Sequence, residues 1–137
     1  MIPAGVYTKS RAGKIAAAGY KNDMKHITTG KVRALFKVLA STREAQAAVM
    51  VLRSGQSTGE VQNEHPRCEQ WLFVVSGSGK ATVGKRRVGL RENSLLLIEK
   101  GEPHQVVNTG KRPMTTINFY SPPAYTKGGD VRDQAKR

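Results

Sequence analysis

Short apolar runs, separated by turn residues at intervals of roughly ten positions, constrain the fold of this chain more than any other feature. This spacing is typical of an all-β sandwich or barrel. No segment between two runs is long enough to hold the crossover helix that parallel strands need, so we expect one antiparallel sheet of about eight strands that closes on itself. The runs expected as strands are Val32–Ala40, Ala45–Arg53, Trp71–Ser76, Lys80–Val83, Arg87–Leu90, Leu95–Glu99, Gln105–Asn108 and Thr115–Tyr120.

The 137 residues are enough for one such domain with an arm at either end. We divide the chain into a basic N-terminal arm (1–31), a barrel (32–121) and a C-terminal tail (122–137), which follows the last strand at Pro122. Residues 126–137 have almost no apolar content, so we expect them to lie on the surface or to be disordered. No membrane span or secretory signal is recognisable, and Cys68 is the only cysteine. These features predict a cytoplasmic protein without disulfides.

The chain is strongly basic, with 23 Lys and Arg residues against 10 Asp and Glu residues and a net charge of +13. Residues 1–43 hold nine of the bases and one acid, a local charge of about +8. Such a charge attracts anions, from small metabolites to nucleic acids. No zinc-finger or RNA-binding motif accompanies it, so a small anionic ligand is favoured over a nucleic acid.

Two stretches, 59–79 and 92–110, contain residues suited to a binding site, and they resemble the two motifs of the cupin family. The motifs run roughly G-x5-H-x-H-x3,4-E-x6-G and G-x5-P-x-G-x2-H-x3-N. The resemblance covers about residues 32–121 and implies an all-β, single antiparallel jelly-roll barrel. The stretch Arg67–Gly77 also resembles the cupin half of bacterial mannose-6-phosphate isomerase/guanylyltransferases.

The resemblance also implies a set of metal-ligand positions. Counting back from Gly77 places Gln70 at the glutamate of the first motif, His65 at its second histidine and Asn63 at its first histidine, and His104 matches the second motif. Only two imidazoles remain, and a neutral amide oxygen is a weak metal donor. A divalent ion (Zn, Ni, Mn or Fe) is therefore expected to be weakly bound or absent.

Alternation along the strand restricts which neighbours can enter the barrel. Glu69 is the alternative to Gln70 as a ligand, and only one of the two can face inward on a regular strand. If Gln70 faces the cavity, Leu72 and Val74 share its face and line the cavity as well. Tyr120 is a further candidate for a lining position.

On the opposite face of the same strand lie Trp71, Phe73 and Val75. An outward apolar face of this kind suits a contact with a second copy of the chain or cover by the N-terminal arm. The cupin resemblance favours the homodimer.

Three functions stay open on these residues. The first is a barrel that binds a small, anionic metabolite, such as a sugar phosphate or an organic acid, with a degenerate divalent-metal site. The second is a non-catalytic ligand-binding or dimerisation module, and the third is a polyanion-binding protein that uses its basic arm. Whether the protein is an enzyme is left open, and no catalytic residue is assigned; if it is one, the resemblance implies a metal-dependent isomerase or dioxygenase.

Overall fold

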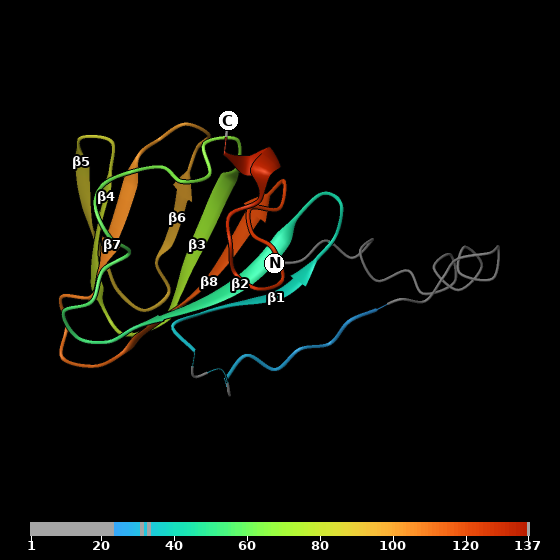
Figure 1. The fold of residues 1–137 in the computed structure, drawn as a ribbon. Coiled ribbons are helices and arrows are strands. Elements are labelled where there is room, and N and C mark those ends of the chain that lie inside the picture. The colour runs from blue at the N-terminus through green and yellow to red at the C-terminus, as the bar shows by residue number, and fades with distance from the viewer. Residues whose placement is uncertain (1–23, 31, 33, 137) are drawn as a thin grey trace, which may run out of the picture.

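The computed structural model describes residues 24–30, 32 and 34–136 and shows two antiparallel sheets packed face to face (Figure 1). The larger sheet has the strand order β1-β2-β8-β3-β6 and the smaller one β5-β4-β7. This arrangement confirms the expected all-β, antiparallel fold, but the eight strands form two sheets instead of the single closed sheet expected. The elements are β1 (Phe36–Ser41), β2 (Gln46–Leu52), β3 (Glu69–Ser76), β4 (Gly79–Val83), β5 (Arg86–Leu90), β6 (Leu95–Ile98), β7 (His104–Val107), β8 (Met114–Ser121) and the 3₁₀ helix η2 (Asp133–Ala135).

The strands lie close to the predicted runs, with differences at their ends. The first strand begins at Phe36 instead of Val32, and β7 begins at His104, one residue earlier than expected. Most of the N-terminal arm, residues 1–23, lies outside the described residues. Among the residues that are described, no helix is long and apolar enough to cross a membrane.

The tight turn between β3 and β4 explains why the glycine that anchors the first motif stands where it does. Gly77 has a φ of +83°, a conformation that side chains rarely adopt. A Cβ atom built on it would lie 2.5 Å from the carbonyl oxygen of Pro113. Gly77 therefore lets the turn after β3 pack directly against the backbone at the start of β8.

The hydrophobic core fills the space between the two sheets at one end of the barrel. It consists of Met50, Leu52, Leu72, Val74, Ala81, Leu90, Val106 and Met114, which come from both sheets. We call this group the apolar end.

The C-terminal tail packs against the other end of the barrel, although residues 126–136 are mostly exposed, as expected. Ala124, Tyr125 and Ala135 are buried there. The Nε of Arg132 donates to the carbonyl oxygen of Tyr125 at 2.7 Å, and a β-bridge joins Tyr125 to Val131. The few apolar residues of the tail are therefore enough to fold it back onto the barrel.

Candidate functional site

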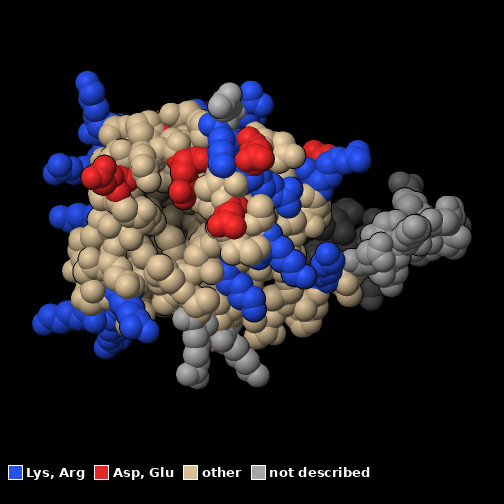
Figure 2. All heavy atoms as spheres, in the orientation of Figure 1, with Lys and Arg blue, Asp and Glu red and all other residues tan. Residues whose placement is uncertain are grey.

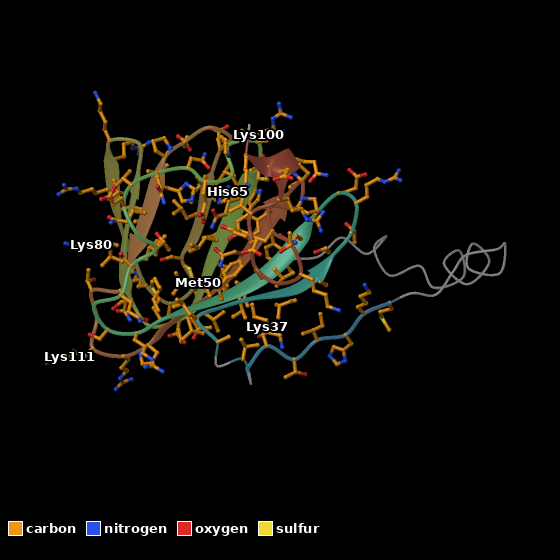
Figure 3. The ribbon with its side chains drawn as sticks, in the orientation of Figure 1. Lys37, Met50, His65, Lys80, Lys100 and Lys111 are labelled. Carbon is orange, nitrogen blue, oxygen red and sulfur yellow. The ribbon has the colours of Figure 1, made fainter. Side chains whose placement is uncertain are left out.

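A cavity of about 310 Å³ opens between the two sheets, a volume that suits a small ligand. Its apolar floor is formed by residues of the apolar end: Met50, Leu52 and Val106. Figure 3 shows His65 nearer the end of the barrel that carries η2, and Met50 towards the other end. The remaining wall is polar and aromatic, and we call its members the polar end: Glu60, Glu64, His65, Gln70, His104, Tyr120 and Tyr125.

His104 is held at the first position of β7 by the loop that precedes β3. The backbone of Gln62 exchanges two hydrogen bonds with the backbone of His104, at 2.9 and 3.2 Å. The Nδ1 atom of His104 lies 3.0 Å from the carbonyl oxygen of Glu102. A carbonyl only accepts hydrogen bonds, so Nδ1 carries the proton and Nε2 keeps its lone pair when the ring is neutral.

His65 is almost completely buried, with 2% of its surface exposed. Its ring centroid lies 5.2 Å from that of His104 and 5.2 Å from that of Tyr120. Its Nδ1 atom is buried and has no hydrogen-bond partner. Burial, together with the nearby His104, lowers the pKa of His65 to about 4, so His65 is a neutral imidazole at neutral pH.

Asn63 connects the segments that carry the two histidines, and it does not line the cavity. Its Oδ1 accepts a hydrogen bond from the backbone N–H of His65 at 3.0 Å. Its Nδ2 donates to the carbonyl oxygen of Glu102 at 3.1 Å, the same oxygen that receives His104 Nδ1. In the structure, Asn63 is therefore a positioning residue for both histidines, and its amide is already engaged.

Of the pair Glu69 and Gln70, the structure places Gln70 on the cavity. The Glu69 carboxylate faces outward and accepts a hydrogen bond from the Trp71 indole at 2.9 Å. Gln70 Nε2 donates to Asn118 Oδ1 at 3.0 Å, and Asn118 Nδ2 donates to Thr116 Oγ1 at 2.9 Å. The Oε1 atom of Gln70 is buried without a partner, like Nδ1 of His65.

Of the three residues expected to line the cavity, only Tyr120 does so. Leu72 and Val74 do share the inward face of β3 with Gln70, as expected from strand alternation, but they are fully buried in the apolar end. The cavity is instead lined on this side by Met50 and Leu52 of β2 and by Val106 of β7.

Sequence reasoning missed Glu64 and Tyr125 as a pair. The Tyr125 hydroxyl donates to Glu64 Oε1 at 3.0 Å, and Gln46 fixes the backbone of Tyr125 with two hydrogen bonds, 2.8 and 2.9 Å long. Burial raises the pKa of Tyr125 and of Tyr120, whose ring centroids lie 5.1 Å apart, so both hydroxyls stay protonated. The signals in the sequence for this contact are the position of Glu64 beside His65 and that of Tyr125 just after the double proline that ends the last strand.

The residues of the cavity do not fit a tightly bound divalent ion. A catalytic zinc site normally has three protein ligands. No group of three or more His, Cys, Asp or Glu side chains within the described ranges could hold a metal ion. His65 and His104 supply two imidazoles, and the nearest further donor suggested by the motif is the neutral amide of Gln70.

Comparison with known proteins identifies the family. Residues 48–120, more than half of the chain, match the model of the cupin domain. The chain belongs to the cupin family. The jelly-roll fold of this cupin is also that of BH2720 from Bacillus halodurans, a solved structure with a TM-score of 0.67, 26% sequence identity and coverage of 82% of this chain and 92% of that one.

Two curated relatives extend the comparison. This cupin is 30% identical over 90 residues to the uncharacterized protein YrkC of Bacillus subtilis. The match covers 61% of this chain and 47% of YrkC. It is 37% identical over 65 residues to the xanthan biosynthesis protein XanB of Xanthomonas campestris. That match covers 47% of this chain and 14% of XanB. The chain thus spans half or less of each curated relative. The distant similarity to XanB agrees with the resemblance carried by Arg67–Gly77.

Proposed function

We propose that this cupin binds a small molecule in the cavity between its sheets, through the imidazoles of His65 and His104. The observation that carries the proposal is the composition of the cavity wall, which includes His65 and Gln70, and each of these side chains also has a buried polar atom without a partner, Nδ1 and Oε1 respectively. A buried polar group without a partner costs about 1–3 kcal/mol. A ligand that hydrogen-bonds to these atoms would remove that cost.

The anionic metabolite expected from the net charge receives no support from the wall of the cavity. Its charged members other than histidine are Glu60 and Glu64, and no Lys or Arg is found among the described residues that line it. A sugar phosphate or organic acid would therefore meet carboxylates. Long-range attraction of anions by the +13 chain remains, but it does not define what the cavity binds.

A divalent ion is at most a weak ligand of the same cavity in this proposal. His65, His104 and the amide of Gln70 would hold it, and the ion would supply Lewis-acid chemistry when bound. Ligand binding without catalysis is the role we propose, because among the described residues no carboxylate or third imidazole is placed with the two histidines so as to complete the donor set of a firmly held catalytic ion.

The experiment is a ligand-observed NMR screen with neutral, anionic and cationic fragments, repeated on two variants. We expect a set of fragments to bind the wild-type protein and to show no binding signal with the variant His104→Ala. The matched control is His26→Ala, since His26 is exposed and does not line the cavity. Fragments that bind wild type and His104→Ala equally well would overturn the proposal, as would a complete absence of binding.

We also propose that the chain forms a homodimer through the outer face of its larger sheet. The register places Leu97, Trp71 and Phe119 side by side across β6, β3 and β8, and all three are exposed. Exposed apolar surface of this kind marks interaction sites. Sedimentation of the wild type should give a dimer and that of Trp71→Glu a monomer, and a monomeric wild type would contradict the proposal.

A further inference from the structure

We propose that the ligand of this cavity is a cation, a small molecule that carries a protonated amine. This inference rests on the proposed binding function and adds the chemical class of the ligand. It follows from three features of the wall: its unpaired carboxylates, its unpaired hydrogen-bond acceptors and its aromatic rings.

The first feature is the charge of the cavity wall. Glu60 and Glu64 line the cavity, and neither forms an ion pair with a described residue, because the single ion pair in the described part of the chain joins Lys136 to Asp133. Figure 2 shows acidic side chains beside a hollow on this face, with Lys and Arg side chains both at its edges and next to some of the acidic ones. In a protein with more than twice as many bases as acids, two carboxylates at one cavity are a local reversal of the overall charge.

The second feature is independent of the carboxylates. His65 and Gln70 are 2% and 5% exposed, and each presents a buried atom without a partner, Nδ1 and Oε1 respectively. Oε1 of Gln70 is an acceptor, and the lone pair on Nε2 of His104 adds a second one, because the Nδ1 proton of His104 is already donated to Glu102. A protonated amine brings two or three N–H donors and no acceptor, so it complements such a wall.

The third feature is a group of three aromatic rings on the cavity wall, Phe36, Tyr120 and Tyr125. The ring centroids of Phe36 and Tyr125 lie 4.7 Å apart, and those of Tyr120 and Tyr125 lie 5.1 Å apart. Aromatic faces attract ammonium groups by about 0.5–2 kcal/mol. Tyr125 also donates its hydroxyl proton to Glu64, which holds the carboxylate beside the rings.

The net charge of +13 does not oppose this arrangement at contact distance. At an ionic strength of 0.15 M the Debye length is about 8 Å, so bases on the far surface are largely screened from a ligand inside the cavity. The charges that a bound ligand meets directly are those of the lining residues.

The test compares three probes of similar size and different charge: 2-phenylethylammonium, 2-phenylethanol and phenylacetate. Their dissociation constants are measured by ligand-observed NMR at pH 7.5 and 0.15 M salt. We expect 2-phenylethylammonium to bind about 3- to 10-fold more tightly than 2-phenylethanol, and phenylacetate to bind most weakly. The variant Glu64→Gln should reduce the ratio of the affinity for the ammonium probe to that for the alcohol, because it removes the carboxylate charge from the cavity wall.

The matched control is Glu92→Gln, which changes the net charge equally at an exposed turn outside the cavity and should preserve the preference. Equal binding of the ammonium and alcohol probes, or tightest binding of phenylacetate, would overturn the cationic ligand and leave the binding function intact. Failure of every fragment and of all three probes to bind would overturn both.

Discussion

The two ends of the barrel interior are built on the same strands and differ in chemistry. On β3 the inward face passes from Gln70 to Leu72 and Val74, and on β8 it passes from Tyr120 through Asn118 to Met114. At the apolar end the side chains of both sheets meet and fill the interior. The polar end begins two residues away along β3 and β8. There a cavity remains, and two buried polar atoms lack hydrogen-bond partners.

The difference teaches which part of the interior serves stability and which serves binding. Apolar packing lowers the free energy of the folded state, while an unpartnered polar atom raises it. Natural proteins tolerate such local costs mainly at functional sites. Substitutions at the two ends should therefore change different measured quantities.

The largest effect on stability is expected at the apolar end. Leu72→Ala removes a fully buried side chain between the sheets and should lower the free energy of unfolding by about 2–5 kcal/mol, measured by urea denaturation. Val75→Ala on the same strand is the control, because Val75 is 40% exposed and should cost far less. Equal losses would mean that the interior is not packed as described.

The next effect is a pH dependence of stability that arises from His65. The pKa of His65 is about 4 in the folded protein and about 6.5 in the unfolded chain, so between these values only the unfolded chain takes up the proton. Its contribution to stability is complete above pH 6.5 and is lost as the pH falls towards 4. Wild type should lose about 2 kcal/mol more than His65→Gln between pH 7 and pH 4.5, and parallel profiles would contradict the burial of His65.

A third prediction concerns metal affinity at the polar end. Gln70→Glu adds a carboxylate next to two imidazoles and should tighten zinc binding by about tenfold or more, measured by calorimetry. Asn63→His should not, because Asn63 lies outside the cavity lining and its amide bonds hold the histidine segments. A tighter site in the Asn63 variant would place that residue inside the cavity after all.

The smallest effect on stability is expected for His104→Ala, at about 1 kcal/mol or less, because the half-buried ring borders an open cavity. The same variant should abolish binding of the fragments that the wild type binds. Melting curves with and without the best fragment measure both quantities. A loss comparable to that of Leu72→Ala would assign His104 to the core.

The sequence predicted the fold well, because turn residues and alternating apolar positions report directly on local backbone geometry. Its two motifs also selected three residues that meet at the cavity: His65, Gln70 and His104. The sequence could not show that the Asn63 side-chain amide donates a hydrogen bond to the carbonyl oxygen of Glu102, 39 residues away. Nor could it show that Tyr125, 61 residues from Glu64, folds back onto the barrel, since such contacts depend on how distant segments pack.

The central claim is that the polar end is a ligand site formed by His65 and His104. The most direct measurement is NMR of the imidazole nitrogens in protein labelled with ¹⁵N in its histidine rings, titrated with 2-phenylethanol and 2-phenylethylammonium. The chain has three histidines, and the exposed His26 is an internal control. We expect saturable shifts for His65 and His104 and none for His26, whereas unchanged signals of His65 and His104, or equal shifts of all three histidines, would contradict the claim.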